Sequence, residues 1–379
     1  MPGTGAHTQQ AHYVVKGGDR DRYVNTHYGE NEWVELGTYQ FTGTPRVELS
    51  NTTDDGTADD DIAFSSIAFK PLSAKPKHMV VAMGDSYSSG EGAGNYSPES
   101  DTSHGTNQWN ACRRGDNFWP RKVLLPFTSS SIADLVKAGD PSLDFQNVTC
   151  SGARTWQLTP GDPAAWGGMG NYHEKTQIDS GVLSADTTLV MLTIGGNDGD
   201  NFTNAVTHCY IIGVCDKSDY TGATDTAVTD TGTLLESIAQ AAPNTRIVLM
   251  GYPHIVADDP CHISDFDTLN SLADYLRDKQ AAKVEELKAT NLKVDYVDAI
   301  PAFHGHGVCD TDEEINAVVI GPKGDGDYHA GDVSGGPCVP QALGGLCASL
   351  ESFHPKNSGT TRYAQIMDQA LADLGYTGG

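Results

Sequence analysis

The sequence predicts an α/β fold with a parallel sheet, preceded by a small all-β region. From residue 78 onward, short apolar runs alternate with segments whose apolar residues recur at helical spacing. Alternation of this kind implies a parallel sheet with helices on both faces. Before residue 70, short strand-like runs are separated by Gly, Asn and Asp clusters and show no helical period.

Residues 1–70 are expected to form the small β domain. Its strand candidates are residues 13–15, 32–36, 38–41, 46–49 and 62–69. About sixty residues are few for a complete β-sandwich. Residues 71–77 contain two prolines and two lysines and are expected to form a short, stiff linker.

Residues 78–379 are expected to form the main domain. Its strand candidates are residues 79–83, 143–148, 188–194, 246–250 and 293–297. Its helix candidates are residues 118–125, 131–138, 231–241, 268–289 and 360–374. Because no phosphate-binding Gly-x-x-x-x-Gly-Lys-Ser/Thr loop occurs, and no Gly-x-Gly-x-x-Gly follows the first strand, a nucleotide-binding function loses support.

Composition excludes several partners. The net charge of −26, from 50 acidic and 24 basic residues, argues against nucleic acid or an anionic membrane as a standing partner. The hydrophobic content of 38% is enough for a packed core. No apolar run approaches the ~20 residues of a transmembrane segment.

The eight cysteines bear on the cellular compartment. None forms a Cys-x-x-Cys pair, which argues against a zinc ribbon and against a thioredoxin-like protein. An even count in loop-like sequence favours disulfides and an oxidising environment. The first five residues show no apolar signal core, which leaves an intracellular protein or a processed or truncated form. We expect a secreted protein whose signal is absent from this chain.

The first candidate for chemistry is the segment 84–92, Gly-Asp-Ser-Tyr-Ser-Ser-Gly-Glu-Gly. It directly follows the first strand candidate of the main domain. Gly84 would let the chain turn, and Ser86 would then stand at the carboxyl end of the strand beside the N–H groups of the next helix. An ordinary polar turn explains the same residues.

Three later residues fit a nucleophilic Ser86. Gly152 follows the second strand candidate, Asn197 follows the third, and His354 precedes the last helix. Strand ends at one edge of a parallel sheet line a single crevice. His354 would accept the serine proton, and the Ser86 N–H, the Gly152 N–H and the Asn197 amide would form an oxyanion hole. Taken singly, each residue also has an ordinary structural explanation. Gly152 could simply permit a positive φ in a loop, Asn197 could cap a helix or turn, and His354 is one of 13 histidines.

Together these residues resemble the SGNH (GDSL) hydrolase family. The segments 84–88 and 195–198 match its first and third blocks, Gly152 matches the second, and His354 with Pro355 matches the last. The resemblance covers about residues 78–379 and is closest to the secreted actinobacterial lipase/esterase branch, which also shows Cys-Ser-Gly-Ala and Gly-His-Gly-x-Cys stretches.

This resemblance implies a flavodoxin-like three-layer α/β/α sandwich and a serine ester hydrolase that needs no cofactor. Ser86 would be the nucleophile, His354 the general base, and Ser86, Gly152 and Asn197 the oxyanion hole. No Gly-x-Ser-x-Gly elbow of an ordinary α/β-hydrolase occurs. The resemblance also implies the first three of four expected disulfides, the fourth following nearest-neighbour order: Cys112–Cys150, Cys209–Cys215, Cys261–Cys309 and Cys338–Cys347.

The group that orients His354 is open at this stage. Many family members carry Asp three residues before the histidine, where this chain has Glu351. Glu351 is a candidate third catalytic residue. Since its side chain is one methylene longer than Asp, we expect a Ser–His dyad in which residue 351 contributes its backbone carbonyl.

The substrate is also open. A lipase or esterase acting on an acyl ester is the first choice, and deacetylation of a polysaccharide is the alternative. Residues 33–64 resemble the end of a golvesin-type β domain, which would then bind the polymer. An inactive binding or adhesion protein is an alternative of another class. His304 and His306 suggest a metal only weakly, and we expect none.

Overall fold

A computed structural model describes the following residues: 8–26, 33–53, 62–63, 66–102, 109–126, 128–161, 169–206, 208–209, 215–257, 266–319 and 349–379. The strands are β1 Ala11–Lys16, β2 Arg22–Val24, β3 Arg46–Leu49, β4 His78–Gly84, β5 Leu143–Asn147, β6 Leu189–Thr193, β7 Arg246–Met250 and β8 Val294–Val297. The helices are α1 Ser86–Ser89, α2 Trp119–Lys122, α3 Ile132–Ala138, α4 Thr155–Leu158, α5 Asn201–Ala205, α6 Ser218–Ala241, α7 Phe266–Ala289, α8 Ile300–Phe303 and α9 Asn357–Asp373. Pro98–Ser100 and Asp198–Asp200 are short 3-10 helices.

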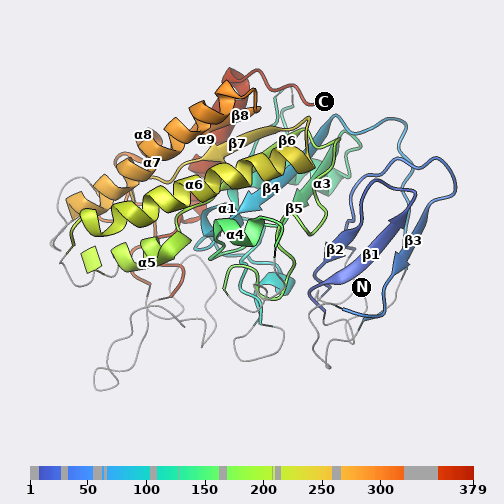
Figure 1. Cartoon of the computed structure of the whole chain (residues 1–379), viewed down its shortest axis with the longest axis horizontal. Coiled ribbons are helices and arrows are strands. Elements are labelled where there is room, and N and C mark those ends of the chain that lie inside the picture. The colour runs from blue at the N-terminus through green and yellow to red at the C-terminus, as the bar shows by residue number, and fades with distance from the viewer. Residues whose placement is uncertain are drawn as a thin grey trace.

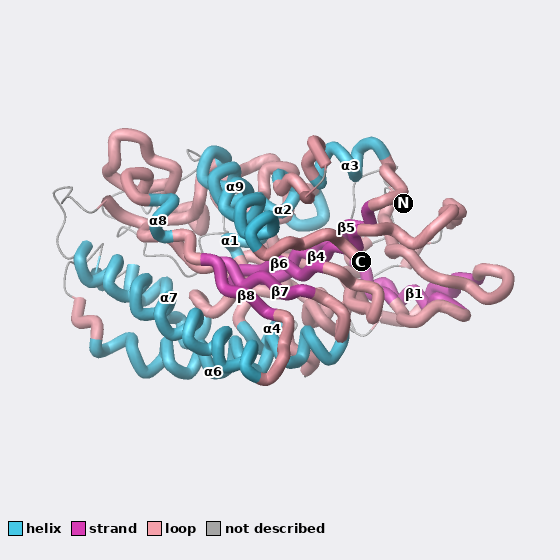
Figure 2. The backbone as a smooth tube through the Cα atoms, turned by 90° about the horizontal axis from the view of Figure 1, so that it is seen from above, coloured by secondary structure: helices cyan, strands magenta, loops and turns pink. Residues whose placement is uncertain are grey.

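The main domain is built on a five-stranded parallel sheet in the order β5-β4-β6-β7-β8. Helices α2, α3 and α9 lie over one face, and α6 and α7 lie over the other (Figure 2). All five strands expected in the main domain are present, which confirms the α/β/α sandwich. Helix α6 begins 13 residues before the expected start, and α2 has only four residues.

Strand side chains alternate between two apolar cores because successive residues of a strand point to opposite faces. Val80 and Met191 pack in the core that contains Tyr363 of α9. Their neighbours, among them Val81, pack in the core that contains Leu234 of α6. Since both faces are covered, the strands are continuous apolar runs, as is usual for parallel sheets.

The amino-terminal part is a three-stranded antiparallel sheet in the order β2-β1-β3. Two of the expected strands, 13–15 and 46–49, are confirmed as β1 and β3, whereas β2 was missed. The expected strands at 32–36 and 38–41 are wrong, because residues 33–41 are irregular; residue 32 lies outside the described residues. Its backbone groups bond side chains instead: the Thr38 N–H donates to Asp144 (2.6 Å), and the Leu36 carbonyl accepts from Arg22 (3.1 Å).

This small sheet lies against the β5 edge of the main sheet (Figure 1). Arg22, only 4% exposed, donates to the Ser180 carbonyl (2.5 Å) and to the Gln146 side chain (3.2 Å). Asn25 donates to the Glu99 carbonyl (3.0 Å). Buried polar contacts of this kind tie the small sheet to the main domain. The described residues of 62–69 form no strand, and the domain limits at 70 and 78 stay predictions.

Candidate active site

Ser86 stands where strand β4 gives way to helix α1. Gly84 has φ +113°, and a Cβ there would lie 2.2 Å from the Thr193 carbonyl oxygen on β6, so the turn requires glycine. Asp85 caps α1 by accepting the Tyr87 N–H (3.1 Å). Ser86 therefore begins the helix at the carboxyl edge of the sheet, as the sequence predicted.

Asp85 is also the centre of a buried polar network that sequence reasoning missed. Its carboxyl group accepts from the Thr193 hydroxyl (2.6 Å) and from the Tyr252 hydroxyl. Tyr252 in turn accepts the Gly196 N–H (3.0 Å), next to Asn197. Burial raises the pKa of Asp85 to about 7, and the hydrogen bonds from Thr193 and Tyr252 oppose that rise. The network fixes the Ser86 turn relative to the loop after β6.

His354 lies against Ser86. Its Nε2 is 2.7 Å from the Ser86 Oγ, and its Nδ1 is 3.0 Å from the Ser352 carbonyl oxygen. The ring is buried, which lowers its pKa to about 4, while hydrogen bonds to the Ser352 and Leu350 carbonyls oppose the shift. The imidazole is thus neutral across the physiological range, with Nδ1–H directed at a carbonyl and Nε2 ready to accept a proton.

The loop that carries His354 is held by residues far away in the sequence. Phe353 has φ +62°, an unusual conformation for a large side chain. Its N–H donates to the Asn316 carbonyl (2.9 Å), and its carbonyl accepts from the Tyr87 hydroxyl (2.7 Å). The Asn316 side chain donates to the carbonyls of His354 (3.1 Å) and Gly92 (2.9 Å). Asn316 therefore joins the His354 loop to the segment after Ser86.

Glu351 is not the group at His354 Nδ1. The carbonyl there belongs to Ser352, so the expectation that residue 351 supplies it is wrong by one residue. The Glu351 carbonyl instead accepts the His354 N–H (3.1 Å) and closes a tight turn. The Glu351 side chain is buried near Tyr96. The pKa of the Tyr96 phenol is raised mainly by burial and then by Glu91, and the Glu351 carboxylate makes a smaller contribution in the same direction.

Gly152 lies on the loop after β5, beside the Ser86 turn. The Cys150 N–H donates to the Gly84 carbonyl (3.0 Å), which aligns the two strand ends. Gly152 has φ +81°, and a Cβ there would lie 2.5 Å from the Met169 side chain. The positive φ favours glycine here, and the Met169 side chain would have to shift to admit a Cβ.

Asn197 follows β6, the neighbour of β4 on its other side. Its side-chain amide donates to the Ala153 carbonyl (3.1 Å), next to Gly152, and an amide nitrogen has a second proton available. Asp198 accepts from the Thr155 hydroxyl (2.6 Å) and so ties this loop to α4. The three strand ends thus bring Ser86, Gly152 and Asn197 to one edge of the sheet.

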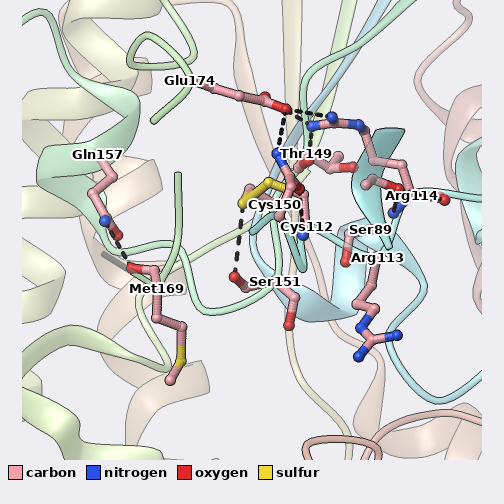
Figure 3. Close-up of a disulfide and its surroundings, with 12 residues drawn as sticks. Ser89, Cys112, Arg113, Arg114, Thr149, Cys150, Ser151, Gln157, Met169 and Glu174 are labelled. Atoms are coloured by element: carbon pink, nitrogen blue, oxygen red, sulfur yellow. Dashed lines mark hydrogen bonds and ion pairs between the residues drawn. A yellow bond between two sulfur atoms is a disulfide. The ribbon is translucent and has the colours of Figure 1, made fainter. Parts of the chain in front are cut away.

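A disulfide braces the Gly152 loop. Cys112 and Cys150 are bonded, and nearby Arg114 pairs with Glu174 while Gln157 donates to the Met169 carbonyl (2.9 Å) (Figure 3). Two expected pairs are confirmed: Cys112–Cys150 and Cys209–Cys215. Cys309 is also disulfide-bonded, while its expected partner Cys261 and the expected pair Cys338–Cys347 lie outside the described residues.

An apolar pocket adjoins the site. It is lined by the following residues: Tyr87, Gly195, Gly196, Asn201, Phe202, Ala205, Val206, Tyr220, Thr224, Tyr252, Pro253, Ile255, Leu269, Leu272, Ala273 and Leu276. Its volume of ≈ 90 Å³ is several times the roughly 10–15 Å³ that one water needs. None of these described lining residues is charged. Sequence reasoning missed this pocket, because its walls come from four separate helices, α1, α5, α6 and α7, and from the loops after β6 and β7.

His306 has acidic neighbours that the sequence did not reveal. Asp312 and Glu314 offer carboxylate oxygens within 4.8 Å of its ring and of each other. Glu314, however, is held by the guanidinium of Arg362 through two hydrogen bonds, one of them 2.8 Å long. The group is accounted for as an ion-pair network. His304, by contrast, is exposed.

A parallel sheet that carries a Ser–His pair at its carboxyl edge, with Gly152 and Asn197 on the loops after the adjoining strands, fits a hydrolytic enzyme. The model of the GDSL-like lipase/acylhydrolase family matches residues 80–366, and the chain belongs to this family. It is a carboxylic ester hydrolase. Among the part that the structure describes, no helix has the length and apolarity that crossing a membrane requires.

The relatives found are streptomycete lipases. The chain is 29% identical over 256 residues to Lipase 2 of Streptomyces coelicolor. This match covers 62% of this chain and 74% of the relative. It is 28% identical over 252 residues to a lipase of Streptomyces rimosus, covering 63% and 76%. The solved structure of an extracellular lipase from Streptomyces rimosus matches with a TM-score of 0.50 and 22% identity, covering 77% of this chain and 98% of the other. That likeness shows the shared fold.

Proposed function

We propose that the protein cleaves acyl esters through a covalent acyl-enzyme on Ser86. The observation that carries the proposal is the 2.7 Å contact between the Ser86 Oγ and the Nε2 of a neutral, buried His354. A general base must reach the proton that it removes, and this distance is within hydrogen-bond range.

In the first step the Ser86 Oγ attacks the ester carbonyl carbon, and its proton passes to His354 Nε2. The carbon–oxygen bond to the alcohol then breaks, and the alcohol leaves with that proton. A water molecule next gives a proton to the same nitrogen and attacks the acyl carbon. Ser86 is regenerated and the carboxylic acid is released, so the proton balance closes.

The carbonyl of Ser352 takes the place that a carboxylate has in a Ser-His-Asp triad. It accepts the Nδ1–H bond and so sets the tautomer and the ring orientation. A carbonyl brings no full charge to stabilise the imidazolium that forms during reaction. The site therefore works as a Ser–His dyad, with the negative charge on the substrate oxygen stabilised by the Ser86 and Gly152 N–H groups and the Asn197 amide.

A lipase or esterase substrate is better supported than an acetylated polysaccharide. The apolar pocket reaches Tyr87 and Gly196, the neighbours of Ser86 and Asn197, and it exceeds what an acetyl methyl group would fill. The alternative of an inactive adhesion protein loses support from the intact contact between Ser86 and His354. We also infer secretion, since disulfides accumulate in oxidising compartments.

The test is hydrolysis of p-nitrophenyl esters by the wild-type chain and by Ser86→Ala. Removal of a triad-type nucleophile costs about 10⁶-fold in rate, so turnover should fall to background while the circular dichroism spectrum is unchanged. Ser131→Ala is the matched control, because Ser131 caps α3 through Asp134 and contributes no group to the Ser–His pair. Activity of Ser86→Ala above a hundredth of wild type would place the nucleophile elsewhere.

A further inference from the structure

Gln177 lies between the loops that carry Ser86 and Gly152. Its side-chain Oε1 accepts the Gly84 N–H (2.7 Å), and its Nε2 donates to the Gly84 carbonyl (2.8 Å), two residues before Ser86. Its backbone N–H donates to the Gln157 carbonyl (3.2 Å) on α4, a helix that begins three residues after Gly152. One buried residue, 4% exposed, therefore bonds to both loops.

The Gln177 amide takes the place of a strand neighbour at Gly84. Strand β5 pairs with β4 as far as Asn147, which lies opposite Ala82, and it ends there. Gly84 is buried, and a buried backbone N–H needs a hydrogen-bond partner. The Cys150 N–H also donates to the Gly84 carbonyl (3.0 Å), so loss of the Gln177 amide would deprive the Gly84 N–H, rather than the carbonyl, of its bond.

The amino-terminal sheet holds Gln177 from the other side. The Ser180 hydroxyl donates to the Gln177 carbonyl (2.7 Å). The Ser180 carbonyl in turn accepts from the Tyr23 N–H (2.9 Å) and from the Arg22 guanidinium (2.5 Å), both on β2. A chain of hydrogen bonds thus runs from β2 through Ser180 and Gln177 to the strand end before Ser86.

The contact between β2 and the segment around Gln177 is close. Asn25 donates to the Glu174 carboxylate (3.0 Å), and Arg20 donates to the Gly181 carbonyl (3.1 Å). A Cβ at Gly181 would lie 2.0 Å from the Asp21 carbonyl oxygen, so the two backbones meet with no side chain between them. A displacement of β2 would therefore move this segment as well.

We propose that Gln177 is a positioning residue that sets the spacing between Ser86 and Gly152, and that the amino-terminal sheet holds Gln177 in place. The inference rests on the proposed function, in which the N–H groups of Ser86 and Gly152 stabilise one substrate oxygen. Two such donors work together only when both lie at hydrogen-bond distance from that oxygen. The amino-terminal sheet then supports the reaction itself, whereas an appendage that only binds a polymer would not affect turnover of a small ester.

The first experiment measures kcat and KM for a p-nitrophenyl ester with Gln177→Leu, which keeps a side chain of similar size and removes both bonds to Gly84. We expect kcat to fall about ten- to a hundredfold, the scale of a misplacement by about 1 Å. KM should stay within about threefold, because the donors act on charge that develops in the transition state.

Thr188→Val is the matched control for that change. The Thr188 Oγ1 lies 3.0 Å from the Met79 nitrogen and 3.1 Å from the Met79 oxygen, so it contacts the same pair of backbone groups near the other end of β4. Its kcat should stay within about twofold of wild type, since distant sites act independently. A fall in melting temperature without a fall in kcat would show that loosening β4 is not enough to slow the reaction.

Gln177→Glu tests the hydrogen-bond pattern separately from packing. A protonated carboxyl group, like the amide, offers a donor and an acceptor, whereas an ionised one only accepts and would repel the Gly84 carbonyl. Because burial raises the pKa of a carboxyl group, the protonated form is favoured at pH 5. Relative to wild type at the same pH, we expect this variant to be much faster at pH 5 than Gln177→Leu.

The link to the amino-terminal sheet is tested by Arg22→Met, alone and combined with Gln177→Leu. Alone it should lower kcat about three- to tenfold, and in the combination it should cost less than about twofold, because the connection to Gly84 is already broken. Arg46→Met is the matched control, since Arg46 is exposed and pairs with Glu48 on the same strand β3. Should Arg22→Met fail to fold, Ser180→Ala removes the hydroxyl bond to Gln177 and is measured in the same way.

The outcomes separate this inference from the proposed function. If wild type hydrolyses no ester, or if Ser86→Ala stays active, the proposed function fails and the inference fails with it. If wild type works through Ser86 but Gln177→Leu keeps its kcat, or Gln177→Glu at pH 5 is no faster than Gln177→Leu, only the positioning role is overturned. Equal costs of Arg22→Met in both backgrounds would overturn the role of the amino-terminal sheet. Should Gln177→Leu fail to fold, Gln177→Glu must be slower, relative to wild type, at pH 8 than at pH 5.

Discussion

The two reacting side chains are held in opposite ways. The nucleophile loop, residues 84–92, is built locally, since a strand ends at Gly84 and Asp85 caps the helix that Ser86 begins. The base loop, residues 349–355, has no regular structure and is held by Asn316 and by the Tyr87 hydroxyl. A substitution on the nucleophile side should remove a group that takes part in the reaction. A substitution around the base loop should instead displace His354, which is still present.

On the nucleophile side, we expect Asn197→Ala to lower kcat by about 10²–10³ with little change in KM. The amide would stabilise charge that develops only in the transition state. Asn244→Ala is the matched control, because Asn244 also donates to a backbone carbonyl, that of Ala185 (2.9 Å), but is exposed at the other end of the sheet. An effect of Asn197→Ala on KM alone would make this residue a binding group.

On the base side, we expect Asn316→Ala to lower kcat by up to about 10², the cost of misplacing a catalytic group by about 1 Å. The substitution removes the side-chain bridge between Gly92 and His354 and leaves the backbone bonds of residue 316 in place. Labelling of Ser86 by a fluorophosphonate should slow in parallel.

The matched control for that change is Asn117→Ala. Asn117 donates its side-chain amide to the Ala93 carbonyl (2.8 Å), which lies on the segment after Ser86 and not on the base loop. If both variants lose kcat equally, and in proportion to the fall in their melting temperatures, Asn316 only stabilises the fold. The nucleophile loop and the base loop would then not differ in how they are held.

This contrast also explains what the sequence could predict. Ser86, Gly152 and Asn197 follow apolar strands, and strand ends meet at one edge of a parallel sheet by rule. Their convergence could therefore be inferred from local pattern. The carbonyl of Ser352 at His354 depends on a positive φ at Phe353, imposed by contacts with Asn316 more than thirty residues away. No local pattern reports such contacts.

The prediction of two amino-terminal strands, at 32–36 and 38–41, failed for a related reason. Residues 33–41 have the alternation and the aromatic content of strands, but no strand among the described residues pairs with them. Their backbone bonds go to Arg22 and Asp144, one of them on the main domain. Strand propensity describes how well a segment fits a pleated surface, and it does not supply the partner.

A pH profile distinguishes a buried base from an exposed one. The pKa of His354 is lowered to about 4, so the neutral, proton-accepting form persists down to that pH and activity falls as pH drops through about 4. A histidine with the ordinary pKa near 6.5 would be only ~3% neutral at pH 5, a loss of about 30-fold. We therefore expect kcat/KM at pH 5 to stay within about twofold of its value at pH 8.

Unfolding must be separated from that titration. Because the folded-state pKa of His354 lies below the unfolded value, its contribution to stability is present above pH 6.5 and is lost as pH falls toward 4. Enzyme held at pH 5 and returned to pH 8 should recover full activity. An acid limb centred between pH 6 and 7 in enzyme that recovers would contradict a buried, neutral His354.

The smallest effect is expected at Glu351, although it stands where many family members carry the triad carboxylate. Since the Nδ1 partner is the Ser352 carbonyl, loss of the Glu351 charge should cost no more than about tenfold in kcat, or roughly 1.4 kcal/mol in activation free energy. Glu351→Gln is the sharper variant, because it removes the charge and keeps the volume of a side chain that is 1% exposed. Glu351→Ala should retain activity in the same range once rates are normalised to sites titrated with a phosphonate.

A loss of about 10³–10⁴ in kcat of the glutamine variant would contradict this expectation, because disabling a triad carboxylate elsewhere costs about that much. It would mean that the Glu351 carboxylate acts on His354 during turnover. The base would then depend on charge as well as on position, and the difference between the two loops would narrow.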